Sequence, residues 1–64
     1  MTYRELAKKL FGNNVEDRPD FENLLCNIGN FDGHRGSTAL NFPDSDASDD
    51  LDIVALEEIM DAYF

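Results

Sequence analysis

The chain has 64 residues, of which 42% are hydrophobic, and its 14 Asp and Glu against five Lys and Arg leave a formal net charge of −9. A chain this short forms at most one domain, so we expect a single small acidic domain over residues 1–64. The charge argues against direct binding to nucleic acid or to an anionic membrane, because both repel carboxylates.

The first expected element is a helix that starts at residues 2–5. Thr2 and Glu5 have the spacing of a capping box, in which the hydroxyl and the carboxylate each satisfy a free backbone amide. An apolar stripe with helical spacing follows, and Gly12 supplies a stop. The stripe consists of Tyr3, Leu6, Ala7, Leu10 and Phe11.

A second helix is expected from Pro19 to Ile28. Proline suits the first turn of a helix, and Phe21, Leu24, Leu25 and Ile28 share one face. A β-strand over Leu24 to Phe31 is the alternative for the second half of this segment.

The next segment is rich in turn formers and contains Asp32-Gly33, a strong hairpin dipeptide. Thr38, Leu40 and Phe42 then alternate like a short strand, which Pro43 ends. We therefore predict an α+β fold of three helices with a possible short β-hairpin around Asp32-Gly33. An all-α fold is the alternative.

The last third of the chain is expected to form an acidic loop over residues 43–50 and a helix over about residues 50–62. The apolar side of this helix is wide, so it must be buried in the core or against a second chain. The predicted core comprises Tyr3, Leu6, Leu10, Phe11, Phe21, Leu24, Leu25, Ile28, Leu40, Phe42, Ile53, Leu56, Met60 and Tyr63.

Charge is distributed very unevenly along the chain. Residues 1–42 carry six acids and five bases, whereas residues 43–64 carry eight acids and no base. Ordinary surfaces intersperse both signs and form ion pairs along helices, so this segment is a candidate partner-binding surface. The predicted binding residues are Asp44, Asp46, Asp49, Asp50, Asp52, Glu57, Glu58 and Asp61.

Two other functions match parts of the same segment. With Asp46 as position one, an EF-hand calcium loop finds suitable residues at positions 3, 5, 7, 8 and 12, but Leu51 replaces the glycine needed at position 6. Residues 49–58 resemble the start of the second helix of acyl carrier proteins. Asp50 stands where that family has the serine that carries phosphopantetheine, so no prosthetic group can be attached there.

Catalysis is not expected. His34 is the only histidine and lies in a glycine-rich turn, and Cys26 is the only thiol. Together they provide too few ligands for a zinc site, and we expect no cofactor and no metal. A single cysteine also cannot form an internal disulfide, which favours a reducing, cytoplasmic setting.

A small, strongly acidic chain with one cysteine and an aromatic-rich core resembles phage anti-CRISPR and anti-restriction proteins of the DNA-mimic type. That resemblance rests on size and charge. It implies a non-enzymatic inhibitor, monomeric or weakly dimeric, that occupies the basic nucleic-acid-binding surface of a protein or nucleoprotein complex in the host cytoplasm. The alternative is an antitoxin-like or adaptor module that docks through its apolar C-terminal helix.

Overall fold

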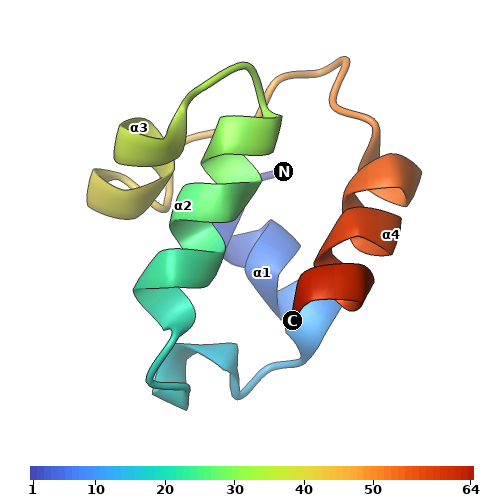
Figure 1. The fold of residues 1–64 in the computed structure, drawn as a ribbon. Helices are drawn as coiled ribbons and strands as arrows, with labels where there is room; N and C mark the ends of the chain where they lie inside the picture. The colour runs from blue at the N-terminus through green and yellow to red at the C-terminus, as the bar shows by residue number, and fades with distance from the viewer.

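The computed structural model describes all 64 residues and contains only helices (Figure 1). The elements in chain order are α1 (Tyr3–Phe11), the short 3₁₀ helix η1 (Val15–Asp17), α2 (Phe21–Phe31), α3 (Gly36–Asn41) and α4 (Ile53–Tyr63). The only β-type pairing is an isolated antiparallel bridge between Thr2 and Asp46. No helix has both the length and the apolar character needed to cross a membrane.

The predicted α+β class with its hairpin is therefore wrong, and the all-α alternative describes the fold. In a type I′ hairpin turn at Asp32-Gly33 both residues would have positive φ, but Asp32 has a φ of −84°, and the positive values, 71° and 68°, occur at Gly33 and His34. Here, however, these residues close the end of α2. The amide of His34 donates to the carbonyl of Asn30, and the amide of Arg35 donates to that of Gly29. The tolerance of Gly33 for positive φ thus serves a helix–helix turn.

Residues 38–42 were expected to be extended, but most of them belong to α3. Their alternation of apolar and polar residues misled the prediction, because Gly36 and Ala39 are the buried residues of α3 and are spaced three apart, as on one helix face. Leu40 and Phe42 are instead 36% and 65% exposed.

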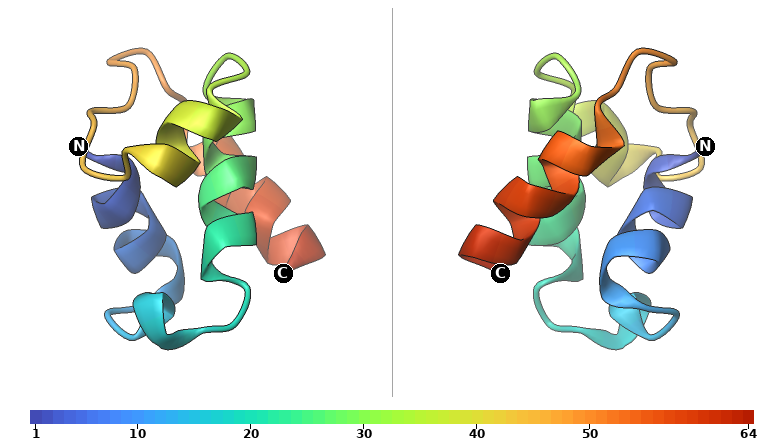
Figure 2. Two further views of the ribbon diagram at one scale, coloured as in Figure 1. Left: turned by 90° about the vertical axis from the view of Figure 1, so that its left-hand side faces the viewer. Right: turned by 90° about the vertical axis from the view of Figure 1, so that its right-hand side faces the viewer.

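Helix α2 begins at Phe21, two residues after the predicted start at Pro19, and contact with α3 explains why it does not end at the predicted Ile28 but continues through Gly29 to Phe31. Gly29 is buried where α3 crosses α2 (Figure 2, left). A Cβ atom built on Gly29 would lie 2.3 Å from the carbonyl oxygen of Arg35 and 2.7 Å from the Cβ of Ala39. Gly29 is therefore a contact point between two helices and not a helix terminator. The strand alternative for residues 24–31 is wrong.

The start of α1 confirms the predicted capping box. The amide of Glu5 donates to Oγ1 of Thr2 at 3.1 Å, and the amide of Thr2 donates to Oε1 of Glu5 at 2.9 Å. The hydrogen bonds from Thr2 hold the pKa of the Glu5 carboxyl below its ordinary value. Two amides that the helix leaves free are thereby satisfied.

Replacing Thr2 by alanine is expected to destabilise the protein by about 1 kcal/mol, because it removes the side-chain acceptor at the helix start. Thermal unfolding followed by circular dichroism measures this change. Thr2→Ser, which keeps the hydroxyl, is the control and should retain most of the stability. Equal losses in the two variants would contradict the capping explanation.

The hydrophobic core is built mainly from α1, α2 and α4. Most predicted core residues are buried or half-buried, but Leu40, Phe42 and Tyr63 are exposed, so their assignment to the core was wrong. Val15, Ala39 and Ala47 are buried although they were not predicted. The fully buried large side chains are Tyr3, Leu6, Val15, Leu24, Leu25, Ile28 and Leu56.

Residues 43–47, which we call the strap, run alongside the start of the chain (Figure 2). The amide of Tyr3 donates to the carbonyl of Ser45, the amide of Arg4 to that of Pro43, and the amide of Ala47 to that of Met1. These bonds fix most of the predicted acidic loop to the body of the protein.

The C-terminal helix begins at Ile53, three residues later than expected, because the side chain of Asp52 caps it: the amide of Ala55 donates to Oδ1 of Asp52 at 3.1 Å. Helix α2 closely approaches α1, α3 and η1, and α1 also approaches η1, whereas α4 lies farther from all of them. It is attached by side chains, chiefly Leu56 and Met60, both of which are buried.

Candidate protein interface

The eight predicted carboxylates do not form one equivalent set, because two of them in the strap lie beside positive groups. Oδ1 of Asp44 accepts a hydrogen bond from Nε of Arg4 at 2.9 Å. Oδ1 of Asp46 lies 3.9 Å from the N-terminal amine. Asp44 and Asp46 therefore neutralise charge within the molecule and contribute less to its acidic surface than the sequence suggested.

None of the ion pairs in the structure involves the other six carboxylates. Most of the bases are engaged elsewhere: Arg4 and Lys8 both lie 3.2 Å from Glu16, and Arg18 lies 2.9 Å from Asp20. We call these six residues the acidic face: Asp49, Asp50, Asp52, Glu57, Glu58 and Asp61. All six are exposed.

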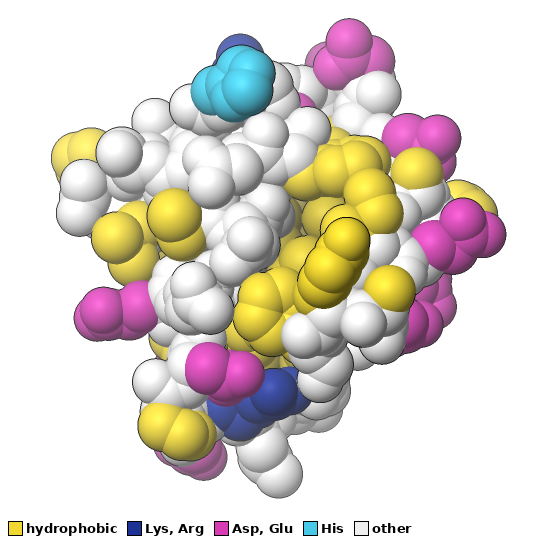
Figure 3. Space-filling model, in the orientation of Figure 1, with side chains coloured by type: hydrophobic (Ala, Val, Ile, Leu, Met, Phe, Trp, Pro, Cys, Tyr) yellow, Lys and Arg dark blue, Asp and Glu magenta, His cyan; other side chains and the backbone are white.

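Helical spacing keeps three of these acids together. Glu57 and Asp61 are four residues apart and Glu58 and Asp61 three apart, so their side chains are neighbours on the outer side of α4. Val54, which is 68% exposed, belongs to the same side. Figure 3 shows acidic side chains following the side of the molecule formed by α4 and the loop before it.

Two of the three remaining acids of this face border a polar hollow of about 420 Å³ at the start of α4. Asp50 and Asp52 line it together with Arg35, Asp32 and Ser48. Its charged side chains are three carboxylates and one guanidinium, so the hollow is negative on balance. Arg35 is the one base that faces this part of the acidic surface.

Asp32 has a structural function in this hollow that the sequence did not indicate. Its side chain is nearly buried, 5% exposed, and its Oδ2 accepts hydrogen bonds from the hydroxyl of Tyr3 at 2.7 Å and the amide of Ser48 at 2.9 Å. Burial alone would raise the pKa of Asp32, but these hydrogen bonds and the charge of Arg35 together lower it. The pKa of the Tyr3 hydroxyl is raised by burial and by its bond to Asp32.

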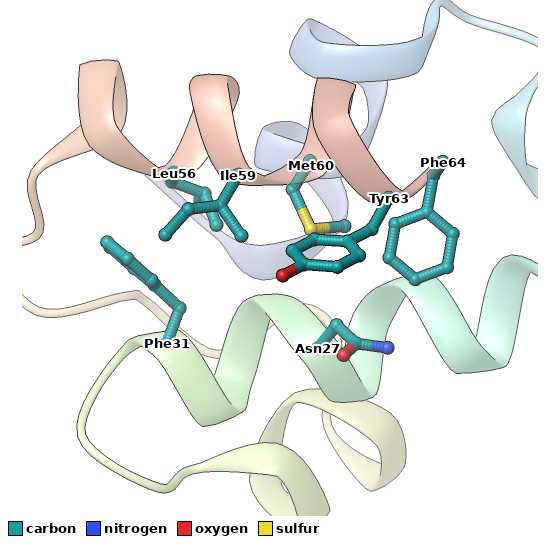
Figure 4. Close-up of a pocket in the computed structure, with 7 residues that line it drawn as sticks. All are labelled: Asn27, Phe31, Leu56, Ile59, Met60, Tyr63 and Phe64. Atoms are coloured by element: carbon teal, nitrogen blue, oxygen red, sulfur yellow. The ribbon is translucent and has the colours of Figure 1, made fainter.

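A second surface feature is an apolar groove of about 400 Å³ between α2 and α4 (Figure 4). Its lining is hydrophobic except for Asn27 and consists of Asn27, Phe31, Leu56, Ile59, Met60, Tyr63 and Phe64. Apolar side chains are visible in the depression between the two helices in Figure 3. The wide apolar side predicted for the last helix was the sequence signal for this groove, which was not itself predicted.

The groups considered for metal binding and catalysis are not gathered in one place. No cluster of three or more His, Cys, Asp or Glu side chains could hold a metal ion, so the EF-hand spacing of residues 46–57 does not produce a calcium cage. His34 is exposed in the turn after α2, and Cys26 is half-buried near the amide group of Asn30.

The chain matches no family model, no curated protein and no solved structure. The acidic face and the apolar groove are the surface features that bear on its function.

Proposed function

We propose that the protein is a non-enzymatic inhibitor that binds a basic nucleic-acid-binding surface by DNA mimicry. An anti-CRISPR protein that blocks target-DNA binding by an effector complex is one example of this class. The observation that carries the proposal is the acidic face, six exposed carboxylates without an ion-pair partner on α4 and the loop before it.

The backbone supports this proposal because it limits the motion of these carboxylates. Asp52 is held as the cap of α4, and Glu57, Glu58 and Asp61 lie on a helix whose buried side chains attach it to the core. Neighbouring carboxylates on a helix are several ångströms apart, comparable with the spacing of phosphates along a DNA strand. A fixed array of negative charge loses less entropy on binding than a flexible acidic tail.

The proposed partner is a basic protein or nucleoprotein complex, and binding would take place in the cytoplasm, that of the host cell if the protein is phage-encoded. A monomer suffices for this activity, because one chain presents the whole acidic face. Strong attraction between charged surfaces speeds association and makes binding sensitive to salt.

The test uses the immobilised protein and an extract of its native host. We expect a basic protein to be retained at low salt and to be released by added double-stranded DNA. Reversing Asp49, Glu57, Glu58 and Asp61 to lysine should lower its affinity by more than about a hundredfold, since close interfacial charge pairs are worth about 1.5–7 kcal/mol each.

The control reverses two exposed acids outside the acidic face, Asp17 and Glu22, to lysine, and it matches in charge change the reversal of Glu57 and Glu58 alone. This variant should keep most of the affinity, and circular dichroism should show that both variants stay helical. Retention that resists high salt, or that DNA does not compete with, would refute DNA mimicry.

A further inference from the structure

We infer that the groove between α2 and α4 binds one amphipathic helix of a partner protein, with aliphatic side chains in the groove and Lys or Arg beside it. This inference goes beyond the proposed function and does not depend on it, because the groove and the α4 part of the acidic face, Glu57, Glu58 and Asp61, lie on different sides of α4, and the two surfaces share only Asp50 and Asp52. The groove is lined by Leu56, Ile59, Met60 and Tyr63, whereas Glu57, Glu58 and Asp61 point elsewhere on the helix.

The walls of the groove are apolar and incompletely covered. Leu56 and Met60 are buried, while Ile59, Tyr63 and Phe64 are 41%, 78% and 41% exposed. Figure 4 shows these side chains of α4, and Phe64 just after it, directed toward α2, which runs in the opposite direction and contributes Phe31 and Asn27. Clustered exposed apolar side chains mark interaction sites, and methionine and aromatic side chains adapt to different occupants.

The shape of the groove favours a helix over other ligands. Two antiparallel helices leave a channel into which the side-chain ridge of a third helix can pack. The fold has no sheet edge to which an extended peptide could add a strand. Asn27 is the only polar residue in the lining, whereas small-molecule sites usually combine several convergent polar groups.

The negative charge of the protein indicates that the partner helix is basic. No base lines the groove, and a second copy of the chain would bring another −9 of charge to it. Phe31 lines both the groove and the polar hollow, so the groove continues toward Asp50 and Asp52. Asp32 in that hollow already accepts bonds from Tyr3 and Ser48, and Oδ1 of Asp52 caps α4, which leaves Asp50 and the other oxygen of Asp52 to bind a Lys or Arg of the partner.

Synthetic peptides of about 16 residues, four helical turns, provide the probe. The first has Leu at helical spacing and Lys elsewhere, the second has the same composition without a helical face, and the third replaces Lys with Glu. Binding is measured by titration, and its location by backbone amide chemical shifts. We expect the first peptide to shift Asn27, Ile59 and Tyr63 and to bind at least about tenfold more tightly than the second. The third should not bind.

Two serine variants on α4 locate the site. Ile59→Ser removes a partly exposed groove side chain and should weaken binding of the first peptide by about tenfold. Val54→Ser removes a more exposed apolar side chain outside the groove and should leave binding unchanged. Both positions are at least 41% exposed, so both variants should fold, and circular dichroism checks this.

Equal affinity for the first two peptides would overturn the inference, because it would show that charge alone causes binding. Shift changes confined to Glu57, Glu58 and Asp61, or equal effects of the two serine variants, would overturn it as well. Concentration-dependent dimerisation in sedimentation experiments that Ile59→Ser abolishes would identify a second copy as the occupant instead.

Discussion

Replacing Gly29 by alanine is expected to destabilise the protein by about 3 kcal/mol, the upper end of the range for overpacked sites. In an exposed helix interior the same substitution is favourable by about 1 kcal/mol, because alanine is the better helix former. The sign reverses here because the new methyl group would lie 2.3 Å from the backbone oxygen of Arg35 and 2.7 Å from Ala39. Relief requires α2 and α3 to move apart.

Thermal unfolding measures this effect. A loss of 3 kcal/mol lowers the melting temperature of so small a domain by about 15 °C or unfolds it at ambient temperature. Gly36→Ala is the matched control, since its Cβ would meet the Asn30 side chain 2.5 Å away, which can rotate aside. The loss of stability in Gly36→Ala should be much smaller than in Gly29→Ala. Unchanged or increased stability of Gly29→Ala would show that the two helices are not in close contact there.

Replacing Asp32 by alanine is expected to cost a similar amount, about 3 kcal/mol, because it leaves the Tyr3 hydroxyl and the Ser48 amide without their acceptor in a nearly buried site. Asp32→Asn keeps an oxygen acceptor and should lose less. Tyr3→Phe removes one of the two donors and should also fall between Asp32→Ala and the wild type.

The contribution of the Asp32 charge depends on pH, and its sign follows from the lowered pKa of Asp32. A carboxyl group whose pKa is lower in the folded state stabilises that state fully above its unfolded pKa, about 3.9, and loses this contribution as the pH falls through the folded pKa. The stability difference between wild type and Asp32→Asn should therefore shrink when the pH is lowered from 7 to below 4. Urea unfolding at several pH values tests this, and a constant difference would contradict it.

The sequence predicted those helices that are determined by residues close together in the chain. The capping residues of α1 are three apart, and the apolar faces of α1, α2 and α4 repeat with helical spacing, so all three helices were expected. Helix α3 was missed because its six residues are too few for a periodic pattern and its buried face consists of Gly36 and Ala39. This face is buried only because it packs against Gly29 of α2, on the other side of the turn.

The acidic face could be predicted only in part, because a count of charges contains no information on which groups meet in space. The pairing of Asp44 with Arg4 joins residues 40 positions apart, and that of Asp46 with the N-terminus spans a similar distance. Asp32 was interpreted as a turn residue for the same reason. Its partners, Tyr3 and Ser48, lie 29 and 16 residues away in the sequence, and no local sequence pattern predicts these two hydrogen bonds.

The bonds of Asp32 and of the strap also divide the molecule into units that open separately. One carboxylate links the start of α1, the end of α2 and the segment after the strap, so none of these three can detach alone without breaking a buried or partly buried hydrogen bond. Helix α4 lies outside this network and is anchored chiefly by Leu56 and Met60. Its amide hydrogens should therefore exchange with solvent through local opening, whereas those of α2 should exchange only when the whole protein unfolds. Both proposed binding surfaces include this less stable helix, so a partner that holds α4 in place would slow hydrogen exchange there first.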